Sequence, residues 1–295
     1  MLLNKSQDQQ KTVLPSTLHA PLPTSHHPLP TRPLSRSLHY GIVVVNKPDG
    51  PTSHQESEYL QRILDIDKAG HSGTLDPGVT GVLPTALGDA TKVTQITLKS
   101  DKEYVGLLFL HKDVPQQQLL DAMKKFTGRI MQMPPVRSAV KRVERPRMVY
   151  DFELLERKGQ DVLVRVRCEA GTYIRKLFHD MGTHLWCGAH MAQLILTKAA
   201  GFSFGESVTL QQLADAVHEY KSGNPERLEK MVYPVERIVE KVPSIIVKDN
   251  VVRGLLHGKT LRREGVDSWS QFAKGEMVTL KNRKNELLTI ANAVV

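Results

Sequence analysis

Apolar and polar positions follow two different periods along the chain after residue 40, so both strands and helices are predicted. Residues 42–45 form a continuous β-branched apolar run that ends in turn-forming residues, as a buried strand would. Residues 161–168 alternate with a period of two, which is typical of a half-buried strand. Residues 117–126 place apolar side chains at helical spacing. The mixture predicts an α+β fold around a mostly antiparallel sheet.

Composition divides the chain into three parts. Residues 1–39 contain 6 of the 17 prolines and show no apolar periodicity, so they are predicted to form a flexible arm. Residues 40–230 carry the mixed helix and strand patterns and are predicted to form the main domain. A polar Gly/Pro cluster at 222–227 interrupts these patterns, and the short β-like runs beyond it predict a small β-rich domain over residues 240–295.

Charge and cysteine content narrow the class of protein. A net charge of +9 and a pI near 9.5 predict a polyanionic partner, with nucleic acid favoured over an anionic membrane. No apolar run is long enough to span a membrane, and no signal peptide is recognisable. Cys168 and Cys187 lie far apart in the sequence and form no metal-binding pair, so neither a disulfide nor a zinc site is expected. This use of cysteine predicts a protein of a reducing, intracellular compartment.

The candidate chemistry centres on the stretch GHSGTLDPGVTGVLP, in which Asp76 stands between Leu75 and Pro77. An Asp-Pro pair in a Gly-rich loop is often only a turn former. However, the neighbouring glycines permit close approach of a ligand, and no phosphate-binding loop, zinc motif or nucleophilic serine motif competes for the active site. A lone carboxylate that acts as a nucleophile would need a cation to keep it ionised and a dry pocket beside it.

Five blocks of sequence then carry a resemblance to a known family. They are NKPDGPTSH at 46–54, GHSGTLDP at 70–77, ATKV at 90–93, KEYVG at 102–106 and EAGTYIRKL at 169–177. In this order and spacing they closely resemble the pseudouridine synthases of the tRNA pseudouridine synthase B and dyskerin family, from about residue 40 to the C-terminus. The segments LHKDVPQQQL, PPVRSAVKR and CGAHMAQL resemble the guide-RNA-dependent branch more closely than the stand-alone tRNA enzymes.

The resemblance implies an architecture and three catalytic residues. It implies a catalytic domain with a mostly antiparallel mixed sheet, and a small β-barrel PUA domain that binds RNA. Asp76 would be the nucleophile that detaches uracil from ribose, by covalent or acid–base work, so that the base rejoins through C5. Tyr104 would stack on the base and assist proton transfer, and Arg175 would pair with Asp76; the alternatives are a core tyrosine and a solvated helix arginine. No metal or organic cofactor is expected.

Further residues are candidates for binding the substrate. Tyr173 would back the pocket and Leu194 would line it, although core packing is the safer interpretation of both. His71 would lie near the flipped nucleotide or else bond to the loop backbone, while Lys47 and Pro48 are expected to shape the loop beneath the site. A basic strip is predicted to follow RNA phosphates, with a solvated charged face as the alternative; its residues are Arg137, Lys141, Arg142, Arg145 and Arg147.

The chain also departs from the family pattern. Gly78 stands where the guided branch usually has Lys, and Ile195 and Leu196 stand where the family has an Arg pair, so positive charge is lost near the RNA. Because the sequence stops at Val295 just after a strand-like run, we expect the small barrel either to lack its last strand or to take one from the N-terminal arm.

Three hypotheses for the function remain open at this point. The first is isomerisation of ribosomal RNA uridines, guided by a box H/ACA RNA and assisted by small accessory proteins. The second is a stand-alone tRNA pseudouridine-55 synthase, and the third is a non-catalytic RNA-binding scaffold. The absence of a Lys/Glu-rich tail favours an archaeal, cytoplasmic protein over a eukaryotic nucleolar one.

Overall fold

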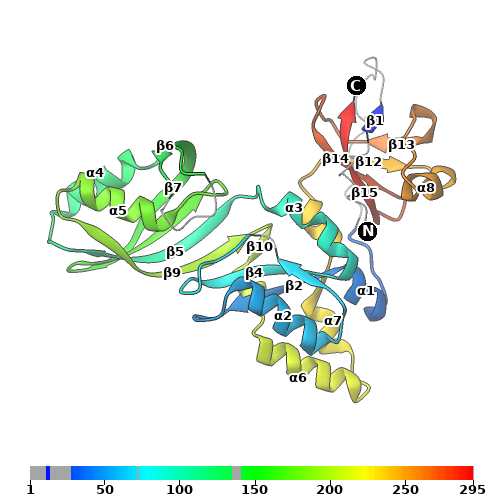
Figure 1. Ribbon diagram of the computed structural model, residues 1–295, viewed down its shortest axis with the longest axis horizontal. Helices are drawn as coiled ribbons and strands as arrows, with labels where there is room; N and C mark the ends of the chain where they lie inside the picture. The colour runs from blue at the N-terminus through cyan, green and yellow to red at the C-terminus, as the bar shows by residue number, and fades with distance from the viewer. Residues whose placement is uncertain (1–10, 14–27, 72, 135–140, 295) are drawn as a thin grey trace, which may run out of the picture. The chain divides into compact units, whose positions relative to one another are not determined.

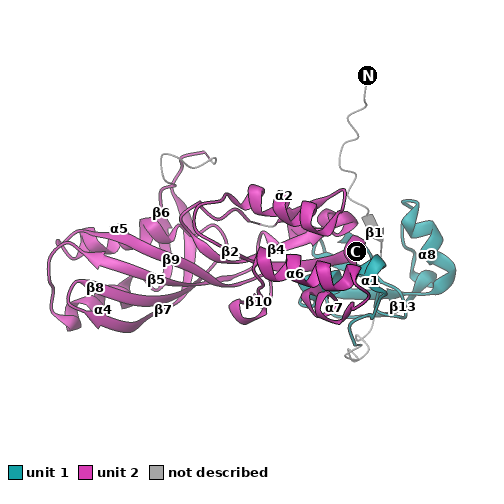
Figure 2. Cartoon of the chain, turned by 90° about the horizontal axis from the view of Figure 1, so that it is seen from below, with its two compact units in different colours: residues 1–37, 233–295 teal, residues 38–232 magenta. Residues whose placement is uncertain are grey.

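The computed structural model describes residues 11–13, 28–71, 73–134 and 141–294 (Figure 1). The chain divides into two compact units (Figure 2). The larger unit comprises residues 38–232. The smaller unit combines the N-terminal segment up to residue 37 with residues 233–295.

A ten-stranded mixed sheet forms the centre of the larger unit. Its strand order is β11-β2-β4-β9-β5-β8-β7-β6, with β3 beside β4 and β10 beside β9. Strands β4 and β9 pair in parallel, whereas β2–β4, β5–β9, β5–β8, β7–β8 and β6–β7 are antiparallel. The predicted α+β fold with a mostly antiparallel mixed sheet is therefore confirmed. The strands are β2 (Gly41–Lys47), β3 (Ala69–His71), β4 (Thr80–Leu87), β5 (Lys102–Leu110), β6 (Gly128–Gln132), β7 (Arg145–Lys158), β8 (Asp161–Cys168), β9 (Ala189–Ala199), β10 (Phe202–Ser203) and β11 (Val232–Pro234).

The parallel contact between β4 and β9 depends on a glycine. Gly81 pairs with Leu196 and has a φ of +110°, and a Cβ atom on it would lie 2.2 Å from the Leu196 carbonyl oxygen. Only glycine fits such a close approach in this backbone conformation. The contact brings the loop that precedes β4 beside β9.

Helices cover the sheet at both ends of the larger unit (Figure 1). Helices α4 and α5 pack on strands β7 and β9, and Phe178 of α5 stacks on Phe152 of β7 at 6.2 Å. Helices α2 and α6 pack together near β2 and β3. The helices of this unit are α2 (Ser53–Leu64), α3 (Thr94–Thr97), α4 (Gln116–Lys125), α5 (Ile174–His184), α6 (Leu210–Lys221) and α7 (Glu226–Met231), with 3₁₀ helices at Gly88–Val93 and Phe204–Glu206. Helix α1 (Leu34–Tyr40) begins in the smaller unit and ends in the larger one.

The three elements predicted from periodicity are present. Strand β2 is buried along almost its whole length, as a continuous apolar run requires. Strand β8 buries every second residue, and α4 buries Leu119, Ala122 and Met123 on one face. These local patterns therefore set the type of each element.

Within its described residues, the smaller unit holds a five-stranded sheet and one complete α-helix. Its strand order is β1-β15-β14-β12-β13. Strand β1 of the N-terminal arm pairs in parallel with β15, with Lys11 opposite Asn292 and Val13 opposite Val294. The N-terminal arm thus supplies a strand to the sheet of the small domain, which is one of the two outcomes expected from the sequence. The elements are β1 (Lys11–Val13), β12 (Ser244–Val247), α8 (Asp249–Leu256), β13 (Val266–Trp269), β14 (Met277–Lys281) and β15 (Leu287–Val294), with 3₁₀ helices at Val235–Val239 and Arg263–Gly265.

A buried ion pair joins the arm to the rest of the smaller unit. Arg32 donates two hydrogen bonds to Glu236, from Nη1 at 2.8 Å and from Nη2 at 2.5 Å. The Glu236 side chain has no exposed surface and also accepts the backbone N–H of Leu287 at 2.7 Å. A bidentate pair with this extra hydrogen bond fixes the arm segment around Arg32 against the start of β15.

No helix within the described residues is both long enough and apolar enough to cross a membrane.

Candidate active site

Asp76 lies in the loop between β3 and β4, and the loop is anchored on both sides of it. Leu75 and Val79 are buried, whereas 59% of the Asp76 side-chain surface is exposed. Ser53 Oγ accepts the backbone N–H of Leu75 at 2.9 Å and donates to the Leu75 carbonyl at 3.3 Å. The Asp76 carbonyl accepts the N–H of Val79 at 2.9 Å. The backbone is therefore held while the carboxylate projects into solvent.

Lys47 supports the same loop from below. Its side chain is fully buried, and Nζ donates to the carbonyl oxygens of Pro48, Pro77 and Val79 at 2.9, 2.8 and 3.0 Å. Burial lowers the pKa of Lys47, and the negative charge of Glu56 is the largest influence that opposes this shift. With all three donors used on carbonyls, Lys47 shapes the loop, as the sequence predicted.

Arg175 is brought to Asp76 by the start of α5. Arg175 Nη2 lies 2.7 Å from Asp76 Oδ2, and 58% of the Arg175 side chain is exposed. The N-terminal end of a helix also favours a carboxylate nearby. Because an exposed ion pair stabilises a fold by only ~1 kcal/mol or less, the main effect of this pair is to orient the carboxylate.

The backbone before Arg175 is held by Gln132, a residue at the end of β6 that the sequence did not single out. Gln132 is buried; its Oε1 accepts the N–H of Tyr173 at 3.0 Å, and its Nε2 donates to the Tyr173 carbonyl at 3.2 Å. Tyr173 itself is half-buried at the N-cap position of α5. Periodicity could not reveal Gln132, because this contact pairs residues 41 positions apart.

Tyr104 on β5 is buried within range of the charge of Asp76. Only 8% of Tyr104 is exposed. Burial, followed by the charges of Cys168 and Asp76, raises the pKa of its phenol well above the ordinary value of 10.0. The phenol therefore stays protonated at any working pH. Across the sheet, Tyr104 pairs with Leu196, so one of the two apolar replacements of the family's Arg pair lies beside this tyrosine.

Leu194 lies one step further along the same face. It pairs with Gly106, and a Cβ atom on Gly106 would lie 3.0 Å from Leu194 Cδ1 and 2.9 Å from Phe178 Cζ. The missing side chain lets Leu194 and Phe178 close over β5. Leu194 is thus a buried residue beside Tyr104, which suits both pocket lining and core packing.

His71 ends β3 and is held by α2. Its Nδ1 lies 2.8 Å from Ser57 Oγ, and Ser57 Oγ donates its own proton to the Ser53 carbonyl at 3.2 Å. We therefore assign the Nδ1–H tautomer, which leaves Nε2 as a hydrogen-bond acceptor. Burial, and secondarily the charge of His54, lowers the pKa of His71. The predicted role of His71 at the flipped nucleotide remains a prediction.

The basic strip is only partly described, since Arg137 lies outside the described residues. Lys141 and Arg142 are exposed. Arg145 is half-buried and bonds weakly to the Lys141 carbonyl at 3.4 Å. Arg147 instead donates from Nε to the Gly171 carbonyl at 2.9 Å, in the turn before Tyr173. Arg147 therefore braces the turn that leads to Arg175, in addition to any contact with RNA.

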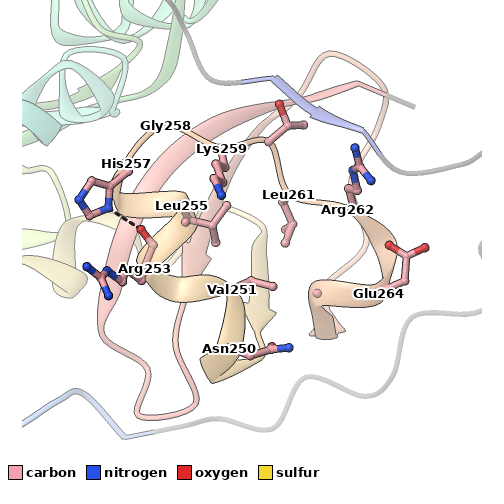
Figure 3. A pocket seen from close by; sticks show the side chains of 13 residues that line it. Asn250, Val251, Arg253, Leu255, His257, Gly258, Lys259, Leu261, Arg262 and Glu264 are labelled. Atoms are coloured by element: carbon pink, nitrogen blue, oxygen red, sulfur yellow. Dashed lines mark hydrogen bonds between the residues drawn. The ribbon is translucent and has the colours of Figure 1, made fainter.

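A separate hollow of about 1140 Å³ lies in the smaller unit (Figure 3). It is formed by α8 and the segment that follows it, up to residue 265. Four basic side chains line it: Arg253, His257, Lys259 and Arg262. No group of three or more His, Cys, Asp or Glu side chains in the described part of the chain is arranged to hold a metal ion.

Family models match most of the chain. The N-terminal domain of TruB family pseudouridylate synthases matches residues 61–118 and 109–174, and the C-terminal domain of tRNA pseudouridylate synthase B matches residues 175–240. The DKCLD (NUC011) domain matches residues 2–56. The two pseudouridylate synthase models together cover the region that carries Asp76, Tyr104 and Arg175.

Curated relatives and solved structures agree with these models. A probable tRNA pseudouridine synthase B of Pyrococcus horikoshii is 45% identical over 90% of this chain and 80% of its own length. One of Korarchaeum cryptofilum is 43% identical over 98% of this chain and 89% of its own length. The crystal structure of a Cbf5–Nop10–Gar1 complex contains a chain with 41% identity and a TM-score of 0.86, covering 94% of this chain and 86% of that one. The structure of an H/ACA RNP bound to a substrate RNA containing 2′-deoxyuridine gives 38% identity and a TM-score of 0.84, with 94% and 86% coverage.

These matches define the class of the protein as an RNA-modifying isomerase. The chain belongs to the TruB family of pseudouridine synthases.

Proposed function

We propose that Asp76 is the nucleophile of this pseudouridine synthase, with Arg175 and Tyr104 as its catalytic partners. The observation that carries this proposal is the Asp76–Arg175 ion pair beside the buried phenol of Tyr104. Isomerisation breaks the bond between N1 of uracil and C1′ of ribose, forms a bond between C5 and C1′, and replaces the hydrogen lost from C5 by one on N1. The carboxylate acts covalently or as an acid–base group on the nucleotide, while the phenol stacks on the base.

We propose that the nucleotide reaches Asp76 only after base flipping. Asp76 and Arg175 are more than half exposed, whereas Tyr104 and Leu194 are buried. A base that stacks on Tyr104 must leave its own stack, at a cost of a few kcal/mol that contacts with the protein offset. We propose that His71, Tyr173 and Leu194 contact the flipped nucleotide.

Replacement of the nucleophile tests the proposal. Asp76→Asn should abolish pseudouridine formation and leave RNA binding intact. Asp49→Asn is the matched control, because Asp49 is an exposed carboxylate in the preceding loop. Full activity of Asp76→Asn would refute the assignment, and an unchanged cellular role without turnover would favour the scaffold hypothesis.

We further propose that the substrate is ribosomal RNA, positioned by a box H/ACA guide RNA and small accessory proteins. The solved structures that resemble this chain are named as Cbf5 with Nop10 and Gar1, and as an H/ACA RNP bound to substrate RNA. The curated relatives are named tRNA pseudouridine synthase B, which keeps tRNA as the second candidate substrate. Because these relatives are archaeal, we propose a cytoplasmic location.

Reconstitution distinguishes the two substrates. Product should appear on a ribosomal RNA fragment only when guide RNA and accessory proteins are added to the purified chain. Product on unmodified tRNA with the chain alone would instead establish a stand-alone synthase.

The smaller unit is proposed to bind RNA as a PUA-like domain. The basic side chains around its hollow support this role, since their positive charge is complementary to the negative charge of an RNA backbone. The double variant Lys259→Met/Arg262→Met should weaken binding of guide RNA and reduce its salt dependence. Lys274→Met, an exposed lysine of the same unit, is the control; equal effects of the two changes would contradict a specific RNA site.

A further inference from the structure

Lys102 lies on the same face of the sheet as the catalytic tyrosine. It is the first residue of β5 and stands two positions before Tyr104, so the two side chains project from one face. In the sheet it is opposite Cys168 of β8 and Ala199 of β9. A Cβ atom on Gly73 would lie 3.8 Å from Lys102 Cε. The lysine stem therefore packs against the loop that carries Asp76.

The ammonium group of Lys102 has few partners. It donates one hydrogen bond, to the Ser100 carbonyl at 3.2 Å, and no carboxylate lies within ion-pair distance of it in the described part of the chain. Burial lowers the pKa of Lys102, although the charges of Cys168 and Asp101 oppose the shift. Asp101 is already engaged, because its Oδ1 accepts the Tyr150 hydroxyl at 2.9 Å.

Two other lysines have hydrogen-bond or ion-pair partners that Lys102 lacks. Buried Lys47 uses three donors on three carbonyls. Lys198 of β9 is exposed and forms an ion pair with Glu103 at 3.0 Å. Lys102 is half-buried yet has neither arrangement. A partly desolvated cation without a counter-ion is costly, and such groups gather at functional sites.

We infer that Lys102 binds a backbone phosphate of the RNA adjacent to the target uridine. This inference rests on the proposed function, in which the uracil stacks on Tyr104 and the ribose meets Asp76. Lys102 stands two positions before Tyr104 on the same face of β5, and its Cε lies 3.8 Å from where a Cβ atom on Gly73 would be. This places the ammonium between the stacking residue and the loop of Asp76, where the backbone next to a flipped nucleotide would pass.

Salt dependence of RNA binding tests the contact. Lys102→Met should weaken binding about tenfold and lower the slope of log affinity against log salt concentration by about 0.7 to 1, as loss of one phosphate contact predicts. Lys102→Arg should restore most of the slope because it keeps the charge. Lys198→Met should leave both values unchanged. A wild-type slope for Lys102→Met, or no rescue by arginine in a variant that melts at the wild-type temperature, would overturn the inference.

A neutral backbone linkage identifies the phosphate directly. RNAs are made with a methylphosphonate on the 5′ side or on the 3′ side of the target uridine. One of them should bind the wild-type protein as weakly as unmodified RNA binds Lys102→Met, and Lys102→Met should lose nothing further on that RNA. Additive losses on both RNAs would refute the contact. Because these measurements need binding only, wild-type protein that shows the contact but forms no pseudouridine would refute the proposed function and not the phosphate site.

Discussion

Arg175 Nη2 lies 2.7 Å from Asp76 Oδ2, although the two residues are 99 positions apart and both side chains are more than half exposed. The loop before β4 and the first turn of α5 meet here, each held by hydrogen bonds from a buried side chain. Ser53 and Lys47 hold the first segment, and Gln132 holds the second. The ion pair therefore joins two backbones that are already in position.

Loss of Arg175 should impair catalysis much more than folding. Arg175→Ala removes the group that orients the carboxylate, and a displacement of about 1 Å can lower a rate by about 100-fold. The midpoint of thermal unfolding should change little, since an exposed ion pair contributes ~1 kcal/mol or less. Single-turnover pseudouridine formation and a melting curve measure the two effects. Unchanged product formation would mean that Arg175 is a surface residue.

Two variants of Tyr104 should distinguish the contribution of ring stacking from that of proton transfer by the hydroxyl. No group in the described part of the chain bonds to its hydroxyl, so Tyr104→Phe should fold with near wild-type stability and keep the stacking surface. Its turnover reports on the hydroxyl alone. Tyr104→Ala should lose about 3 to 5 kcal/mol of unfolding free energy, as large aromatic truncations in a core do. Equal stability of the two variants in denaturant titrations would contradict the buried position of the ring.

The candidate site was only partly predictable from local patterns. Periodicity identified β2, β8 and α4, because burial on one or both faces imposes a regular spacing of apolar residues. The Gly-rich loop pointed to Asp76 and to its need for a cation. The identity of that cation, Arg175, came from the resemblance to a family, since nothing in the spacing of residues links positions so far apart.

The remaining parts of the site depend on tertiary contacts that leave no periodic signal. Gln132 bonds to the backbone of Tyr173, and Arg147 bonds to the Gly171 carbonyl, yet each resembles an ordinary polar residue of a strand in the sequence. Lys102 could have been noticed as the residue two positions before Tyr104, on the same strand face. In the arm, Arg32 contacts a glutamate 204 positions away. Polar contacts of this range are set by the finished fold.

His71 should make stability depend on pH. Burial lowers the pKa of His71 below its ordinary value of 6.5, so the unfolded chain takes up this proton at a higher pH than the folded chain does. Between the two pKa values the unfolded state binds more protons, and the free energy of unfolding therefore falls as the pH drops below about 6.5. Denaturant titrations at pH 7.5 and pH 5.5 should show a smaller difference for His71→Gln than for wild type. Equal differences would exclude His71 as the source.

The Arg32–Glu236 ion pair should contribute strongly to the stability of the smaller unit. Arg32→Ala leaves the fully buried Glu236 carboxylate without its bidentate partner, which should lower the free energy of unfolding by about 3 to 5 kcal/mol. Arg36 is the control, because it is more than half exposed and pairs with Glu286 at 3.2 Å. Arg36→Ala should lose ~1 kcal/mol or less.

Fluorescence can localise this loss. Trp269 packs against the core of the smaller unit, whereas Trp186, the other tryptophan, is 91% exposed in the larger unit. In a Trp186→Phe background, the emission of Trp269 therefore reports unfolding of the smaller unit alone. Arg32→Ala should shift its transition to lower denaturant, while Arg32→Met/Glu236→Met should recover part of the loss because neither partner of the pair is left as an unpaired charge. If the double variant were as unstable as Arg32→Ala, the lost packing of the arm, and not the unpaired carboxylate, would be the cause.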